Sequence, residues 1–194
     1  YVNSTDDGFN VNAKGGKLII NGGSLKIIAG GDGLDSNGSI VMTGGTAYVD
    51  GPTVNNNGSV DYEGSFTISG GTLVASGSSG MAQAPGSTST QPSVLMYYTS
   101  TQAQGTAIVL KDASGNKVAE FTPSKQYSSV AISSPLLKVG STYTLYSGAK
   151  ELVKFTLSSM TTYMSETGAI AQPMGPGGKP GGQMIPPGGM IKRP

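Results

Sequence analysis

Three copies of an eight-residue block dominate the first half of the chain. They read GKLIINGG, GSIVMTGG and GSFTISGG, and they begin at Gly16, Gly38 and Gly64. The starts lie 22 and then 26 residues apart, and each copy is followed directly by a second short apolar run. Repeats of this period are typical of solenoids, in which one unit cannot bury its apolar face alone.

Each block has the pattern of a short strand. Apolar residues alternate or run together over three to five positions, which is too short for a helix. The paired glycines that follow suit a sharp corner, because glycine adopts positive φ freely. A strand, a Gly-Gly corner, a second strand and a polar corner make one coil. We therefore predict an all-β parallel β-helix over residues 1–82, with a β-sandwich as the main alternative.

The sequence changes character after this region. Residues 83–92 belong to a Ser/Gly/Pro-rich loop that looks too polar to pack, and residues 93–165 read as a strand-rich continuation or irregular cap. Helix is expected at most as one turn near Ser134–Leu137. The DASGN run, residues 112–116, predicts a hairpin turn with Gly115 at the positive-φ position. The strands of this region are expected in the following ranges: Ser93–Tyr98, Thr106–Leu110, Lys117–Phe121, Ser129–Ile132, Thr142–Tyr146 and Leu152–Leu157.

The amino-acid composition excludes several classes of function. Cys and His are absent, which excludes disulfides, thiolate metal sites and imidazole chemistry. No apolar run is long enough to span a membrane. The single arginine, Arg193, argues against nucleic-acid binding. Only 12% of residues are charged while Gly numbers 31, which suits an extracellular or cell-surface protein. Because the chain starts with Tyr1 and not Met, we expect a trimmed mature form.

The polar corners carry the candidate chemistry. Asp35 and Asp61 each lie three residues before a block, and the Asp6-Asp7 doublet and Asp32 occupy similar corners. Equivalent residues of neighbouring coils stack about 4.8 Å apart, so these carboxylates repel one another. Calcium prefers such oxygen ligands. We therefore expect calcium at Asp6, Asp7, Asp32, Asp35 and Asp61. The alternative is that Asp and Asn only cap turns.

Catalysis is not expected. Paired carboxylates such as Asp32 with Asp35 could suggest a glycosidase, but no apolar pocket for a protonated acid is apparent. A polysaccharide lyase would need a basic catalytic residue, and no lysine is singled out. The tyrosines Tyr97, Tyr98, Tyr143 and Tyr146 could stack on sugars, although packing is the more ordinary role of tyrosine in strands.

Three runs carry a resemblance to a known family. They are GGDGLDSNGSIVMTGG, DYEGSFTISGGTLVASGSSGMAQAP and YSSVAISSPLLKVGSTYTLYSG. Together they resemble secreted bacterial β-helix proteins described as carbohydrate-binding domain-containing. The resemblance covers roughly residues 1–160. It implies a right-handed parallel β-helix, bound calcium at Asp32 and Asp35 and further at Asp6, Asp7 and Asp61, and binding to plant cell-wall polysaccharides. It does not identify sugar-contacting residues.

The C-terminal tail, residues 166–194, is rich in Gly, Pro and Met. Thirteen of the last 22 residues are Gly or Pro, which predicts an extended segment. Because β-helix ends invite edge pairing, we expect residues 173–194 to dock on a neighbouring copy and to form a homo-polymer. The alternative function is therefore that of a self-assembling subunit of an extracellular fibre or surface layer.

Overall fold

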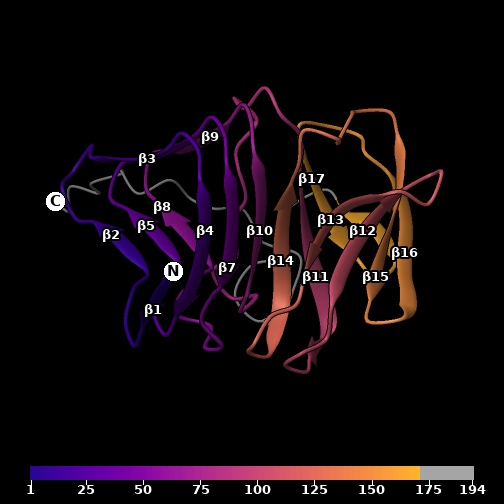
Figure 1. Cartoon of the computed structure of the whole chain (residues 1–194), viewed down its shortest axis with the longest axis horizontal. Coiled ribbons are helices and arrows are strands. Elements are labelled where there is room, and N and C mark those ends of the chain that lie inside the picture. Colours follow the sequence, from indigo (N-terminus) through magenta and orange to yellow (C-terminus); the bar gives the residue numbers. More distant parts are fainter. Residues whose placement is uncertain (171–194) are drawn as a thin grey trace, which may run out of the picture.

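The computed structural model describes residues 1–170, and these residues form an all-β structure of four sheets (Figure 1). Sheet A has eight strands in the order β1 (Val2–Ser4), β4 (Ser24–Ala29), β7 (Thr46–Asp50), β10 (Thr72–Gly77), β14 (Tyr127–Ser133), β11 (Ser93–Gln102), β17 (Thr161–Ser165) and β18 (Gly168–Ile170). Among the described residues no helix is long and apolar enough to cross a membrane.

The other three sheets are smaller. Sheet B comprises β2 (Phe9–Val11), β5 (Leu34–Ser36) and β8 (Val60–Tyr62), and sheet C comprises β3 (Lys17–Ile20), β6 (Ser39–Met42) and β9 (Ser65–Ile68). Sheet D has the order β13 (Lys117–Phe121), β12 (Ile108–Asp112), β15 (Thr142–Ser147) and β16 (Lys150–Thr156).

The repeated blocks supply sheet C. Their strands β3, β6 and β9 pair in parallel and in register, so that Leu18, Ile40 and Phe66 are successive partners. The run that follows each block enters sheet A as β4, β7 or β10, and these strands also pair in parallel. The second glycine of each Gly-Gly pair has positive φ, as the corner requires: 80° at Gly23, 84° at Gly45 and 87° at Gly71. The parallel pairing contradicts an antiparallel sandwich over these residues.

The interior between sheets A, B and C is apolar because alternate side chains point inward. Ile27, Val49 and Ala75 form one fully buried row along sheet A, and Ile40 and Phe66 form another along sheet C. These rows belong to one hydrophobic cluster. Their stacking explains why three short strands per repeat, none longer than six residues, form a stable unit.

The segment 78–92 is packed, and the expectation of an unpacked polar loop was wrong. It covers the edges of β8 and β9 that pair with no other described strand. Gly86 N–H donates to the carbonyl of Phe66 and Thr90 N–H to that of Ile68. Ala84 and Gln91 are buried. Backbone hydrogen bonds to the third repeat hold this polar segment in place. The amino-acid composition of the segment does not predict such bonds.

The second half of the chain is mainly antiparallel. All six expected strands are present, with ends shifted by a few residues, and β17 and β18 were not predicted. The hairpin turn between β12 and β13 is confirmed, with Gly115 at φ 83°. Ser134–Leu137 forms a turn and no helix. Strands β14, β11, β17 and β18 extend sheet A beyond the repeats.

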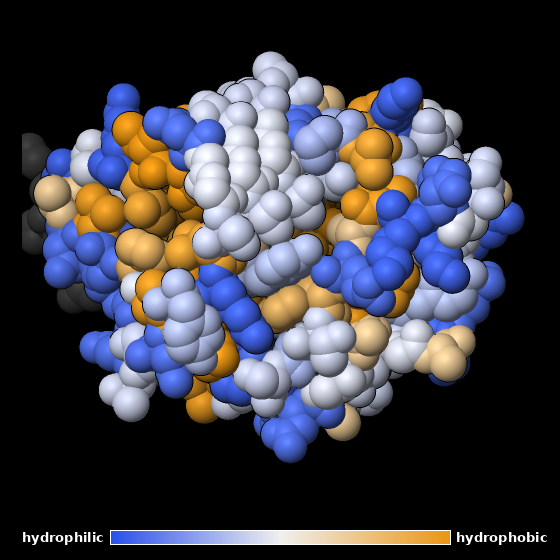
Figure 2. Space-filling view, in the orientation of Figure 1, coloured by the Kyte–Doolittle hydropathy of each residue, from blue (hydrophilic) through white to orange (hydrophobic). Residues whose placement is uncertain are grey.

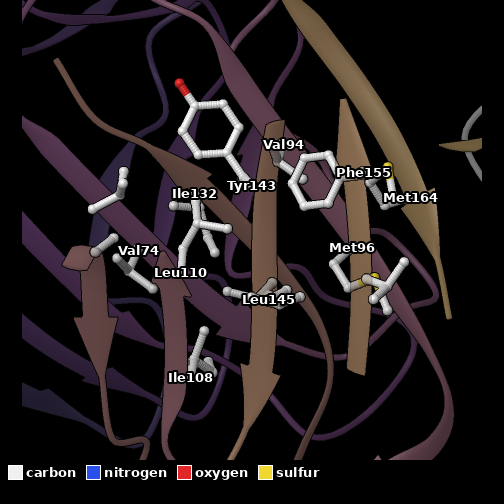
Figure 3. Close-up of a cluster of buried hydrophobic side chains, with 14 of the residues drawn as sticks. Val74, Val94, Met96, Ile108, Leu110, Ile132, Tyr143, Leu145, Phe155 and Met164 are labelled. Carbon is white, nitrogen blue, oxygen red and sulfur yellow. The ribbon is translucent and has the colours of Figure 1, made fainter. Parts of the chain in front are cut away.

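Sheet D covers the outer face of the extended part of sheet A. Figure 3 shows Val94 and Ile132 of sheet A close to Leu110 and Phe155 of sheet D. Strand alternation divides the residues of sheet A between two clusters: Val74 faces sheet D, whereas its neighbours in β10 face the interior of the repeats. The repeats and the second half therefore share one sheet.

At the opposite end of the repeats, β1, β2 and β3 each lie at the edge of their sheets. Partly buried apolar side chains surround a depression of about 270 Å³ there, and Figure 2 shows apolar surface gathered at this end of the molecule. The lining includes Phe9, Leu18 and Leu25. The predicted docking segment, residues 173–194, lies outside the described residues.

Candidate functional site

The outer face of sheet B carries a ladder of polar side chains. Asn10 of β2, Asp35 of β5 and Asp61 of β8 are direct partners in the parallel register. The next position along the ladder is taken by Gln83, whose amide Nε2 donates to Asp61 Oδ1 at 3.2 Å. Because neighbouring strands lie about 4.8 Å apart, Asn10, Asp35 and Asp61 follow one another at this spacing, and Gln83 adjoins the last of them through its hydrogen bond.

A second row of carboxylates lies at the corner before sheet B. Asp7 Oδ1 accepts a hydrogen bond from the backbone N–H of Asp32 at 2.8 Å, and Asp32 Oδ1 accepts one from that of Gly58 at 2.6 Å. Each aspartate thus ties its own corner to the next one. The third repeat has Gly58 where another aspartate would continue the row.

The carboxylates of both rows affect one another. Burial is the largest cause that raises the pKa of Asp32 to about 6; the charges of Asp61, Asp7 and Asp35 add to the rise, and the hydrogen bond from the Gly58 N–H opposes it. Burial followed by the charge of Asp61 raises the pKa of Asp35. Burial also raises the pKa of Asp61, with a further contribution from Glu63. The site is therefore a partly desolvated cluster of negative charge.

No cationic side chain of the described region neutralises this cluster. The one ion pair within residues 1–170 joins Lys117 to Glu120 in sheet D. None of the three raised pKa values is opposed by a lysine. The arrangement is favourable for a bound cation, which would supply the missing positive charge.

The donor set suits a hard cation in kind, but the side chains are not gathered around one point. Within residues 1–170 no three acidic side chains lie together as a metal-binding group. Asp7 uses one oxygen on Asp32 and the other on the side-chain amide of Asn10. Asp35 and Asp61 remain the best-placed pair, because an ion bound at about 2.3–2.6 Å to oxygens of adjacent strands fits between them.

The five predicted ligands thus divide into three groups. Asp35 and Asp61 are ladder partners, and Asp7 and Asp32 are linked through the backbone. Asp6 is exposed at the edge of the same corner, where it borders Gly31 together with Asp7. Sequence reasoning did not propose Asn10, Gln83 or Glu63. Asn10 ends the run DGFN, and Asp35 ends the similar run DGLD in the next repeat, whereas no sequence pattern marks Gln83.

The tyrosines considered for sugar stacking are mostly packing residues. Tyr97, Tyr98 and Tyr143 are at most 7% exposed. The hydroxyl of Tyr143 donates to the carbonyl of Leu136 and accepts from the N–H of Lys138. Tyr146 remains partly exposed and lies beneath the ammonium group of Lys111, 4.8 Å from the ring centre. Burial removes the first three from any sugar surface.

Comparison of the chain with models of protein families, with curated proteins and with solved structures finds no match.

Proposed function

We propose that this protein is a non-catalytic, calcium-stabilised extracellular protein that binds plant cell-wall-type polysaccharide, built on a right-handed parallel β-helix. The parallel register of sheets A, B and C over three successive repeats supports the β-helix assignment. The polysaccharide and the handedness rest on the sequence resemblance of the three quoted runs.

One observation carries the calcium proposal. Asp35 and Asp61 are neighbours on the outer face of sheet B, and the pKa of each is raised by burial and by nearby carboxylates. Such a pair is unfavourable when ionised unless a cation lies between the groups. Asp35 and Asp61 would hold the ion, with Asn10 and Asp32 supplying further oxygens. The bound calcium would contribute charge neutralisation and stability.

The second candidate function is that of a self-assembling subunit of an extracellular fibre or surface layer. The observation that favours it is the end of the repeats, where β1, β2 and β3 are edge strands beside an apolar depression. Edges of this kind pair readily with another chain.

Two measurements separate these functions. Pull-down on pectin and on cellulose, with calcium and with EDTA, tests polysaccharide binding, and we expect retention that EDTA weakens. Negative-stain microscopy tests assembly: a binding protein that does not assemble gives isolated particles, and a self-assembling subunit gives filaments. If neither polysaccharide retains the protein in calcium, the binding function is wrong; filaments in the same sample would establish the second candidate.

A further inference from the structure

We propose that the end of the repeats formed by β1, β2 and β3 is a dimer interface. Two copies of the chain meet there about a two-fold axis, and β2 of one copy pairs with β2 of the other in antiparallel order. This end of the molecule lies away from sheet D (Figure 1). Dimerisation is independent of polysaccharide binding. It also uses the apolar end differently from a fibre subunit, because an isologous contact closes on itself and forms no filament.

Apolar side chains are left uncovered at this end. Phe9 and Leu18 point inward, yet they stay partly exposed and line the depression of about 270 Å³. Their partners in the next repeat, Leu34 and Ile40, are fully buried. On the outer face of β3, Ile19 is 55% exposed, and Figure 2 shows apolar surface gathered here. One further layer of apolar side chains would therefore complete the core, as it does between the repeats.

The same three strands present backbone groups at their free edges. Parallel pairing uses the N–H and C=O groups of alternate residues. In β1, β2 and β3 the inward-facing residues make these bonds to the next repeat, as at Ser4, Phe9 and Ile20. The N–H and C=O groups of the residues between them point away from the next repeat, and such an edge readily pairs with another strand. These residues are Asn3, Asn10, Lys17 and Ile19.

A two-fold axis at Asn10 fits the edge of β2. Antiparallel pairing centred there sets each residue opposite the one that lies equally far on the other side of Asn10. Asn10 then faces Asn10 of the second copy, and the two exchange both backbone hydrogen bonds, as a hydrogen-bonded antiparallel pair does. Phe9 faces Val11 of the second copy, and both are inward-facing and partly exposed. The pairing thus continues the inner row of sheet B across the axis.

The same register also fits the other two edges, because it brings β1 of one copy opposite β3 of the other. Val2 faces Leu18, and both point inward and are partly buried. Asn3 faces Lys17, and the backbone groups of both point to the edge. One axis therefore matches inward-facing residues with inward-facing ones in all three sheets, and joins the apolar depressions of the two copies into one interior.

The charges at this end favour a second copy as the occupant. Asp6 and Lys14 each lie four residues from Asn10, on opposite sides of it, so they face each other. Both are exposed, and the two-fold axis forms the pair twice. Residue 10 also stands where the later repeats carry Asp35 and Asp61. An asparagine there keeps carboxylates from meeting on the axis, where like charges directly opposite are destabilising.

Sedimentation velocity of the full chain over a series of concentrations, with calcium present, tests the interface. We expect a reversible dimer. Lys14→Asp should raise its Kd at least about fivefold, because two pairs of like charges then face each other. Asp6→Lys should do the same, and the double variant Asp6→Lys/Lys14→Asp should return the Kd to within about twofold of the parent. The control Lys154→Asp, an exposed lysine of β16, should also stay within about twofold.

The variant Asn10→Cys reports the two-fold axis directly. The chain has no cysteine of its own, so a short bismaleimide joins two copies only through residue 10. Covalent dimers should form readily, because facing Cα atoms of such a pair lie about 5.5 Å apart. Lys154→Cys, the control, should give only the background of random collisions.

Four results would overturn the dimer interface. They are a parent that stays monomeric at about 100 μM, single charge reversals that leave the Kd unchanged, a double variant as weak as the single ones, and Asn10→Cys that crosslinks no more than Lys154→Cys. Amine crosslinks in the parent from Lys14 to Lys179 or Lys192 of another copy would also overturn it, and would make residues 173–194 the occupant. The pull-down on pectin and cellulose decides polysaccharide binding separately, so either proposal can fail without the other.

Discussion

Asp35 of β5 and Asp61 of β8 are direct partners in the parallel register of sheet B, and the charge of Asp61 raises the pKa of Asp35. Parallel in-register strands keep equivalent side chains adjacent, so carboxylates placed at the same position of successive repeats cannot separate. The register that stacks apolar side chains inside the repeats therefore also stacks carboxylates on the outer face of sheet B, where they repel one another. This conflict between backbone register and charge determines how calcium and pH should affect the protein.

The double variant Asp35→Asn/Asp61→Asn should lose the stabilisation by calcium. At a free calcium concentration of about 100 times Kd, binding stabilises the folded parent by about 2.7 kcal/mol. For a protein of this size that is roughly 5–10 °C in Tm. Differential scanning calorimetry with calcium and with EDTA should show this rise in the parent and less than about 2 °C in the variant. Asp112→Asn, in the turn of sheet D, is the control; an undiminished rise in the double variant would contradict a metal site here.

Stability in EDTA should fall as pH rises from about 4 to about 6. The pKa of Asp32 is raised from 3.8 to about 6, so over this window the folded state binds more protons than the unfolded state. Stability then decreases with pH, because ionisation is easier after unfolding. The raised pKa values of Asp35 and Asp61 act in the same direction. Thermal melts in EDTA at a series of pH values measure this slope, and a Tm that rises across the window would contradict it.

The Asp32→Asn substitution measures how much of this pH dependence of stability comes from Asp32 and how much from the other carboxylates. The side-chain amide of the variant would retain an oxygen for the Gly58 N–H and remove the charge. In EDTA at about pH 7.5 the variant should melt at least about 2 °C above the parent, corresponding to roughly 1 kcal/mol. Its melting temperature should also vary less between about pH 4 and 6. A lower Tm than the parent at neutral pH would show that the charge of Asp32 is compensated in the folded protein.

The glycines of the repeats differ in how much space they have. A Cβ on Gly38 would lie 2.1 Å from the carbonyl oxygen of Gly16 in the previous repeat, a contact with backbone that cannot move aside cheaply. Gly38→Ala should therefore destabilise the protein by about 1–3 kcal/mol or more. Gly22→Ala, at a corner with nothing within 4 Å, should change stability by less than about 0.5 kcal/mol. Urea unfolding of both variants measures the difference; equal values would argue against the close stacking of repeats.

The repeats could be predicted from the sequence because the same block recurs at a nearly regular spacing. The three Gly-Gly blocks mark equivalent corners, and Phe9 and Leu34 of the similar runs DGFN and DGLD are direct partners in the structure. The alignment on each block also placed Asp35 opposite Asp61. These relationships are local copies of one unit, so a single sequence contains the comparison that reveals them.

The features that the sequence did not predict arise from contacts between segments that lie far apart in the chain. Gln83 reaches Asp61 from a segment with no strand pattern, and backbone hydrogen bonds to Phe66 hold that segment. The covering of sheet A by sheet D follows from the two-sided apolar pattern of β11, which also fits a fully buried strand in any sheet.

Asp50 and Ser124 add a polar link between the two halves of the molecule. Asp50, on the outer face of β7, is 2% exposed and accepts hydrogen bonds from the N–H of Ser124 at 2.6 Å and from its hydroxyl at 2.5 Å. Ser124 lies in the connection between β13 and β14, and its neighbour Lys125 donates to the carbonyl of Ala29 in β4. This connection therefore fastens the second half to two successive repeats.

Asp50→Ala should destabilise the protein by about 1–3 kcal/mol, because it removes the buried carboxylate that accepts both hydrogen bonds from Ser124. A double-mutant cycle with Ser124→Ala should show coupling of at least about 0.5 kcal/mol, whereas Glu151→Ala, an exposed carboxylate of β16, should combine additively with Asp50→Ala. Hydrogen exchange provides the structural readout: amides of β14 should lose protection in Asp50→Ala before those of β6, because the lost bonds fasten the connection to β14. Additive effects of Asp50→Ala and Ser124→Ala, with unchanged exchange in β14, would show that the pairing of β10 with β14 and the apolar contact of sheets A and D hold the two halves together without this link.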